Sequence, residues 1–435
     1  MELLYLSGLF LFLLFLLLGM GVWVGLALLG VAWVIMEVFV GRVPGQGMAM
    51  VVWSHSTSWT LTALPLFIWM GEILYRTRLS QDLFRGLAPW VSRLPGGLLH
   101  TNIAGCTLFA AISGSSAATL TTVGKMSIPE LQQRKYSEKM VVGTLAGAAT
   151  LGLMIPPSLT LIVYGVTVNE SITKLFMAGV VPGILLATLF TAYIAIWSLL
   201  NRDSNTVKEP KTSLLEKLNA SRLLIPLLVL IAVVIGSMYL GFATATEAAA
   251  VGVIGAFALA AVQGSLSKST IIDSVLGAVR TSAMIALILM GASFLSLAMA
   301  YTGLPSALAD WINHLALSPI TLIIALTLFY IVIGMFLDGI SAVVLTMAVV
   351  EPMVRAAGID IIWFGIFIVI VVEMAQITPP VGFNLFVLQG ITRHDIGYIA
   401  KAAFPMFLIM VFMVFLLVVI PEIATYLPST AAQLK

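Results

Sequence analysis

Long apolar runs follow one another along almost the entire chain, with only short polar segments between them. About 20 apolar residues are enough to cross the hydrocarbon core of a bilayer. Charged residues make up 9% of the chain, whereas a soluble globular protein carries about 25%. A chain inside lipid must satisfy its backbone hydrogen bonds internally, as a helix does. The sequence therefore predicts an all-α membrane protein surrounded by the lipid bilayer.

The apolar runs form two sets of six on either side of a polar loop at residues 201–221. In the first set, a repeat at residues 1–200, the runs cover 3–18, 21–40, 58–75, 98–130, 139–173 and 175–200. In the second set, a repeat at residues 222–421, they cover 223–241, 243–263, 281–301, 323–355, 361–392 and 397–421. Residues 422–435 remain as an expected periplasmic tail.

The two sets match each other at a nearly constant distance along the chain. Ser116 matches Ser341, and each is followed by alanine. The Pro-Pro pair that begins at Pro156 matches the pair that begins at Pro379, at almost the same separation as the two serines. An internal duplication is the simplest explanation of this agreement.

Basic residues lie at both ends of the run 98–130, and Lys and Arg favour the cytoplasmic side. These residues are Arg76, Arg78, Arg85, Arg93, Arg134, Lys135 and Lys139. The matching run 323–355 follows a segment between Tyr301 and Ile320 without Lys or Arg, and at its end Arg355 is the only basic residue, against Glu351 and Asp360. We therefore expect each run to enter and leave on one side as a re-entrant hairpin, the first from the cytoplasm and the second from the periplasm.

Matching hairpins that enter from opposite sides define inverted-topology repeats, the architecture of many secondary transporters. Each repeat then has five spans, one re-entrant hairpin and one broken helix. Tracing these spans places the loop 201–221 in the cytoplasm and both termini in the periplasm of a bacterial inner membrane. The first run, 3–18, lacks the basic start and the cleavage site of a signal peptide, so we expect it to remain as a span.

Four interruptions of the helices fall at matching places in the two repeats. Two are the hairpin tips, and two are Pro-Pro pairs, which remove amide donors and free carbonyl oxygens. Carbonyl and hydroxyl oxygens suit a small alkali cation, and half-helices that begin at a break direct partial positive charge toward an anion. The candidate ion- and substrate-binding residues are Ser113, Gly114, Ser115, Ser116, Pro156, Pro157, Ser158, Asp338, Ser341, Thr378, Pro379, Pro380 and Gly382.

Three carboxylates in apolar surroundings and one histidine among hydroxyl and aromatic side chains leave more than one interpretation open. Asp338, at the second hairpin tip, is a cation ligand or a simple N-cap. Glu373, ahead of the second Pro-Pro pair, holds a proton or pairs with a polar neighbour. Glu247 opens an apolar run, where it caps a helix or serves function. His55, between two tryptophans, is an interfacial anchor or a substrate contact.

Several other classes of protein lack support in the sequence. There is no P-loop, no HExxH and no GxSxG, and the four histidines are scattered. The net charge of +2 gives no basic surface for nucleic acid, and the single Cys106 is expected to pack in the interior. Neither a filter sequence nor a charged ring indicates a channel. We expect a transporter and not an enzyme.

Segments from about residue 60 to 390 resemble the large membrane subunit of TRAP transporters, the tripartite ATP-independent periplasmic family. They are Ala63–Phe67, Phe109–Ala118, Ile155–Ser158, Tyr164–Gly165, Leu175–Gly183 and Thr378–Leu385. Two segments differ from the family pattern. Leu345–Val350 has no proline where the family often has one, and Trp53–Trp59 replaces the usual small or aromatic residues.

The resemblance implies an elevator-type, sodium-driven importer of an organic acid. Its expected partners are a small four-helix membrane subunit and a soluble periplasmic substrate-binding protein. Because the chain begins directly with the large subunit, we expect the small subunit to be a separate polypeptide. The alternative is a sodium/carboxylate symporter of related architecture that needs no binding protein.

The resemblance also implies where sodium, the expected coupling ion, would bind, and no cofactor is expected. Family sodium sites lie around the hairpin tips and broken helices, which adds Asn384 to the residues named above. The predicted sodium ligands are Ser113, Ser116, Asp338, Ser341, Thr378 and Gly382.

The breaks also suggest which spans move. The two hairpins and the spans 139–173 and 361–392 are expected to form a transport domain. The unbroken spans 3–40, 175–200, 223–263 and 397–421 are expected to form a scaffold that holds the small subunit.

Overall fold

A computed structural model describes residues 2–201, 213–304, 307 and 318–433. The chain is helical throughout this part, with no strand, which confirms the all-α prediction. Within these residues five helices are long and apolar enough to cross a membrane, or seven if two bent helix pairs each count as one span. Shorter apolar helices supply the hairpins and the broken spans. The protein is a multi-pass membrane protein.

The first half of the chain contains a hairpin, a broken span and a long final helix. Its elements are α1 (Glu2–Gly19), α2 (Val24–Ile35) with η1 (Met36–Val40), α3 (Pro44–Ser56), η2 (Thr60–Thr62), α4 (Ala63–Tyr75), α5 (Leu79–Val91), η3 (Gly97–Leu99), α6 (His100–Ser113), α7 (Ser116–Gln133), α8 (Glu138–Ala149), α9 (Leu151–Met154), α10 (Leu159–Thr167) and α11 (Ile172–Leu200). The helices α6 and α7 form the first expected hairpin. The helices α8, α9 and α10 form the first broken span, which bends by 41°.

The second half repeats this order of elements. It contains α12 (Leu214–Ser221), α13 (Ile225–Tyr239), α14 (Ala245–Val262), α15 (Lys268–Thr302), α17 (Pro319–Gly334), α18 (Gly339–Ala356), α19 (Ile361–Gln376), α20 (Phe383–Thr392), α21 (Ile396–Val419) and α22 (Glu422–Gln433). The helices α17 and α18 form the second hairpin, and α19 with α20 forms the second broken span. The unbroken α15 corresponds to the pair α3 and α4.

Three contacts between the two halves occur in pairs that the internal duplication relates. The helix α2 packs on α15, and their counterparts, α14 and α4, pack on each other. Likewise α8 packs on α21 while α19 packs on α11, and α7 packs on α20 while α18 packs on α10. Glycines permit close approach in these pairs. A Cβ atom added to Gly25 of α2 would lie 2.8 Å from the backbone of Leu287 in α15.

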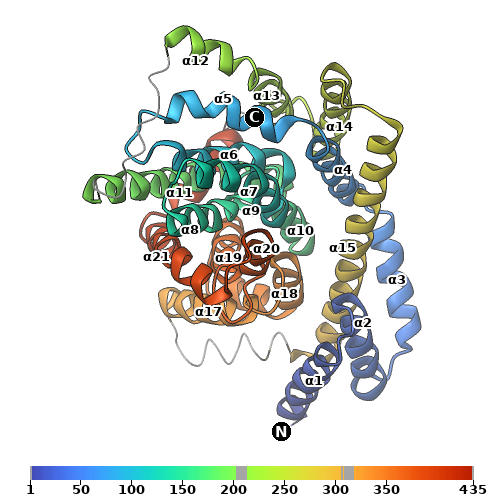
Figure 1. Cartoon of the computed structure of the whole chain (residues 1–435). Helices are drawn as coiled ribbons and strands as arrows, with labels where there is room; N and C mark the ends of the chain where they lie inside the picture. Colours follow the sequence, from blue (N-terminus) through green and yellow to red (C-terminus); the bar gives the residue numbers. More distant parts are fainter. Residues whose placement is uncertain (1, 202–212, 305–306, 308–317, 434–435) are drawn as a thin grey trace.

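The helices fall into two groups (Figure 1). The outer group consists of α1 to α4 and α13 to α15, and α15 runs along its length at the right of the view. The hairpin block consists of α6 to α11 and α17 to α22. The two groups meet where α4 packs on α6 and α10 and where α15 packs on α18. The helix α5 lies beside the block and also contacts α12.

The predicted division between scaffold and transport domain stays a prediction. The spans 175–200 and 397–421 were assigned to the scaffold because they are unbroken. The corresponding helix α11 packs on α9, α10 and α19, and α21 packs on α8, α19 and α20. Both helices therefore lie against the broken helices of the hairpin block.

Several helices lie outside the predicted runs. The helices α3, α5 and α12 were not predicted because they are short or amphipathic, and α15 begins at Lys268 although the apolar run begins only at residue 281. Residues 422–433 of the expected tail form α22, which packs along α11. Most of the loop 201–221, including Arg202, Lys208 and Lys211, lies outside the described residues.

Candidate functional site

The first hairpin tip is a tight turn held by its own hydroxyl groups. Gly114 has φ of +58°, a left-handed conformation that suits glycine. The hydroxyl groups of Ser113 and Thr119 are 2.8 Å apart and share a hydrogen bond. Ser115 caps α7, because its Oγ accepts a hydrogen bond of 3.4 Å from the amide of Ala118.

The first helix break packs directly on this tip. The Pro156–Pro157 bond is cis, and the buried Ser158 caps α10 by accepting from the amide of Leu161 at 3.2 Å. The amide of Leu159 donates to the carbonyl of Gly114 at 3.2 Å. A Cβ atom on Gly114 would lie 2.7 Å from the carbonyl oxygen of Pro157. The tip and the break therefore meet backbone to backbone.

The second hairpin tip carries a carboxylate as its cap. Asp338 accepts hydrogen bonds of 3.2 Å from the amides of Ile340 and Ser341, and the Ser341 hydroxyl also donates to it. The N-cap interpretation of Asp338 is therefore confirmed as geometry, and it leaves the cation interpretation open. Next to this cap, a Cβ atom on Gly339 would lie 2.9 Å from Leu153 of the first broken span.

The second helix break is tied to the second tip. The Pro379–Pro380 bond is also cis. The amide of Gly382 donates to the carbonyl of Met335 at 3.1 Å, and Gln376 Nε2 donates to the carbonyl of Leu337 at 3.0 Å. Gly382 has φ of +55°, and the carbonyl oxygen of Thr378 lies 2.7 Å from where its Cβ would be. The predicted ligands Thr378 and Gly382 thus lie together.

A third set of contacts crosses between the two halves. The Ser116 hydroxyl at the first tip donates to Asn384 Oδ1 at the start of α20, at 3.4 Å. Glu373 of α19 is 1% exposed, and neither carboxyl oxygen has a hydrogen-bond partner. Ser116 lies near that carboxyl group without reaching hydrogen-bond geometry. The amide nitrogen of the fully buried Asn384 is also unpartnered. The structure thus brings together three residues that the sequence presented separately.

The four breaks give the centre of the hairpin block a mixed electrostatic character. The helices α7, α10, α18 and α20 all begin at a break, and each helix N-terminus carries a partial positive charge of about half a unit. Asp338 offsets this charge at α18, whereas serines or glycine cap the other three. Pro156 and Pro157 are buried, but Pro379 and Pro380 are exposed. Hydroxyl, carbonyl and carboxylate oxygens can receive a cation here, and the uncompensated amides can receive an anion.

Two of the ionisable candidates lie away from this centre. Glu247 forms a capping box with Thr244 at the start of α14, which confirms its capping role. His55 Nε2 lies 2.8 Å from the Ser293 hydroxyl, so the ring joins α3 to α15 inside the outer group. Neither residue contacts a hairpin tip. Cys106 is fully buried in α6, as expected.

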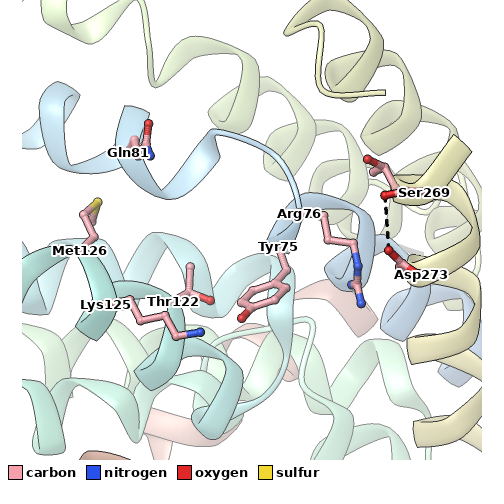
Figure 2. A pocket seen from close by; sticks show the side chains of 9 residues that line it. Tyr75, Arg76, Gln81, Thr122, Lys125, Met126, Ser269 and Asp273 are labelled. Atoms are coloured by element: carbon pink, nitrogen blue, oxygen red, sulfur yellow. Dashed lines mark hydrogen bonds between the residues drawn. The ribbon is translucent and has the colours of Figure 1, made fainter. Parts of the chain in front are cut away.

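Two cavities open where the outer group meets the hairpin block. The first, of about 530 Å³, lies between the end of α4, α7 and the start of α15 and includes Tyr75, Thr122 and Lys125 (Figure 2). The second, of about 380 Å³, lies between α15 and α18 and includes Ala300 and Met347. The sequence analysis missed both sets of lining residues. The sequence held one signal for the first cavity. Thr122 and Lys125 are three residues apart on the same hairpin arm, and residues at that spacing share a helix face.

Comparison with known proteins points to one family. Residues 11–423 match the family described as "Tripartite ATP-independent periplasmic transporter, DctM component". The chain is 31% identical to the isethionate TRAP transporter permease protein DctMQ of Oleidesulfovibrio alaskensis, over 95% of this chain and 65% of that protein. It is also 31% identical to the C4-dicarboxylate TRAP transporter large permease protein DctM of Pseudomonas aeruginosa, over 89% of each chain.

A solved structure shares the fold. The YdaH transporter of Alcanivorax borkumensis superimposes with a TM-score of 0.60, covering 83% of this chain and 84% of that one. The two sequences are 13% identical. At that identity the likeness concerns the arrangement of the helices alone.

Proposed function

The chain belongs to the DctM family of tripartite ATP-independent periplasmic transporters, and from this membership we propose that it carries an organic acid inward across the bacterial inner membrane, coupled to sodium. The protein is a TRAP transporter large permease and not an enzyme. Relatives named for C4-dicarboxylates and for isethionate share an acidic head group, which supports an organic acid, and a carboxylate first, as the substrate.

The contact between Ser116 and Asn384 is the observation that carries the sodium proposal. It joins the first hairpin tip to the second broken helix at 3.4 Å. Glu373 lies beside it as a buried carboxyl group without hydrogen bonds. Burying such a group without a partner is unfavourable, and a small cation coordinated by these oxygens would satisfy it. The predicted ligands Asp338, Ser341, Thr378 and Gly382 complete a second oxygen-rich cluster at the other tip.

The paired contacts between the two halves support inverted repeats. A two-fold relation between the repeats requires that if α2 packs on α15, then α14 packs on α4, and both contacts are present. The same holds for α8 with α21 and α19 with α11. On this proposal the hairpin block, with α11 and α21 included, moves as an elevator against the outer group. Alternating access in other repeat transporters is largely a rigid-body movement of one bundle against another.

We assign two protein partners to the permease on the basis of its family. A periplasmic substrate-binding protein would deliver the acid, and a small four-helix membrane subunit would pack against the permease. The outer group offers apolar surface for that subunit or for lipid, including Trp23, Leu26, Phe242 and Ile254, all of which are exposed.

Uptake into proteoliposomes tests this proposal. The permease is reconstituted with its small subunit, and radiolabelled succinate or isethionate is added with the binding protein. We expect accumulation that requires an inward sodium gradient and the binding protein together. Accumulation that persists when sodium is replaced by choline would refute sodium coupling. Full uptake without the binding protein would instead favour the two-component symporter.

A further inference from the structure

The first cavity contains polar groups that the contacts of the fold leave unused. Figure 2 shows the polar ends of Thr122 and Lys125 close together on α7, with the Tyr75 ring beside them in the same cavity. Thr122 is 5% exposed, and its hydroxyl group has no hydrogen-bond partner, although the neighbouring Thr121 bonds the carbonyl of Ala117 at 2.8 Å. A buried hydroxyl without a partner is unfavourable. The cavity therefore suits a ligand that can form a hydrogen bond with Thr122.

The charge at the α7 end of the cavity favours an anion as that ligand. Arg76 is paired with Glu72. Asp273 keeps its negative charge, because its hydrogen bond of 3.5 Å comes from the neutral hydroxyl of Ser269, but it lies at the α15 end of the cavity, away from Lys125 (Figure 2). Lys125 forms no ion pair within the described part of the chain, so its ammonium group is the uncompensated charge at the α7 end. A carboxylate placed between Lys125 and the Thr122 hydroxyl would gain a charge-assisted hydrogen bond and a neutral one.

The position of the cavity connects it to the centre of the hairpin block. Ser116 begins α7 at the first tip, and Thr122 lies further along this same helix, at a distance that corresponds to ~9 Å of helix rise. Lys125 follows one turn later. A ligand leaving the tip along α7 would meet these residues in order.

The second cavity occupies the equivalent place in the other repeat and lacks this chemistry. In the register that pairs Ser116 with Ser341, Tyr75 corresponds to Ala300 and Thr122 to Met347. Both counterparts line the second cavity. Lys125 corresponds to Val350 in the same register. The duplication thus provides an internal comparison. Of the two cavities, the one beside the first hairpin combines an unpartnered hydroxyl group with an uncompensated cation.

We propose that Tyr75, Thr122 and Lys125 form a carboxylate-binding subsite that receives the transported acid between the first hairpin tip and the membrane surface. The inference rests on the proposed transport of an organic acid. Arg76 lines this cavity, and Arg78 and Arg85 follow it in sequence. Because Lys and Arg favour the cytoplasmic side, the proposed topology places the subsite on the side where the acid is released. On this proposal the second cavity opens toward the other side of the membrane and does not bind the anion.

Thiol labelling tests the subsite without relying on transport. Met126 lines the cavity beside Lys125, so Met126→Cys in a Cys106→Ala background places one reporter there and leaves the three proposed residues intact. Labelling rates are measured at low ionic strength, because salt screens such interactions. The reagents are an anionic and a cationic methanethiosulfonate, applied to membranes that contain the full chain. Succinate, isethionate and inorganic phosphate serve as competing anions.

We expect the anionic reagent to react faster and succinate or isethionate to slow its reaction. Lys125→Gln should lower the ratio of anionic to cationic rates about tenfold, because removing one charge at several ångströms changes each rate roughly threefold in opposite directions. Thr122→Val should weaken protection by roughly three- to tenfold, the effect of one hydrogen bond. Lys125→Arg should restore both properties.

Lys139→Gln is the matched control, because Lys139 is exposed at the start of α8 and does not line the cavity. The subsite is refuted if Lys139→Gln lowers the rate ratio as much as Lys125→Gln does, or if no carboxylate or sulfonate protects Met126→Cys. Protection by phosphate alone would also refute it, because it would indicate a general anion cavity. A failed uptake assay with intact labelling behaviour would refute the proposed import and leave the subsite standing.

Discussion

Asp338 combines a structural role with a proposed ligand role, and substitutions can separate them. Asn at an N-cap accepts the same amide hydrogen bonds as Asp but carries no charge. If the carboxylate binds sodium, Asp338→Asn should raise the sodium concentration for half-maximal uptake at least tenfold, nearly as much as Asp338→Ala. Only Asp338→Ala should also lower the stability of the protein, by about 1 kcal/mol for the lost cap.

The measurement combines sodium titration of uptake with thermal unfolding in detergent. Asp360→Ala is the control, because Asp360 caps α19 by accepting a hydrogen bond of 2.7 Å from the amide of Trp363 and is not among the candidate ion- or substrate-binding residues. It should lower stability to a similar extent without a comparable change in sodium dependence. If Asp338→Asn keeps the sodium dependence of the original protein, Asp338 is only a cap.

Glu373 differs from Asp338, because its carboxyl group forms no hydrogen bond in the structure. Because its carboxyl group is buried without hydrogen bonds, Glu373→Gln removes no interaction that holds the fold. We expect this variant to unfold at the same or a higher temperature than the original protein while its uptake falls at least tenfold. Parallel loss of stability and uptake would show a packing role instead. Uptake that becomes independent of pH but keeps its sodium dependence would indicate that Glu373 carries a proton.

At the scale of elements, the contact between the first tip and the first break is fixed by one glycine. Gly114→Ala should be strongly destabilising for two reasons. An alanine at positive φ costs about 1–2 kcal/mol, and its Cβ would lie 2.7 Å from the Pro157 carbonyl oxygen, which adds about 1–3 kcal/mol of overpacking. Uptake should be lost even where the protein is still produced.

Gly264→Ala separates these two effects. Gly264 follows the end of α14 with φ of +64° and has no atom within 4 Å of an added Cβ, so only the conformational term applies. Thermal unfolding of both variants in detergent measures the difference. Equal destabilisation at Gly114 and Gly264 would contradict the close packing of the tip on the break.

The sequence predicted these breaks because their causes are local. The Pro-Pro pairs cannot donate helical hydrogen bonds, and Gly114 and Asp338 are residues that turns and caps require, so the hairpin ends were predicted within a few residues. The contact of Ser116 with Asn384, 268 positions away, depends on tertiary packing and was not predicted, and Asn384 itself became a candidate only through the resemblance to a family. The packing of α11 and α21 on the broken helices was not predicted, because the composition of an apolar helix does not indicate which other helices it contacts. The helices α5 and α12 were missed because amphipathic segments fall below an apolar threshold.

At the scale of the whole molecule, the division into two groups predicts which cross-links stop transport. Ala300 of α15 and Ala348 of α18 line the same cavity from opposite groups. With Cys106→Ala, the pair Ala300→Cys and Ala348→Cys bridged by mercuric ion should block uptake, and a reducing thiol should restore it. The reason is that the bridge joins the hairpin block to the outer group.

A second pair lies within the hairpin block and serves as the control. His394 Nε2 and Glu138 Oε1 are 2.8 Å apart, and a flexible bismaleimide between Glu138→Cys and His394→Cys should leave uptake above half of its original rate. Unchanged uptake with the Ala300–Ala348 bridge complete would contradict movement between the two groups. Equal inhibition by both bridges would mean that the block itself must deform.

The helix α15 has 35 residues without a break, which corresponds to ~52 Å, whereas the hydrocarbon core is about 30 Å thick. Its counterpart, α3 with α4, is interrupted between Ser56 and Ala63 and has a joint where it can adapt. An unbroken rod of this length must tilt or extend into the head-group region, and its tilt depends on the thickness of the surrounding lipid. The length of the lipid acyl chains thus affects the tilt of α15 and, through the contact of α15 with α18, the position of the hairpin block.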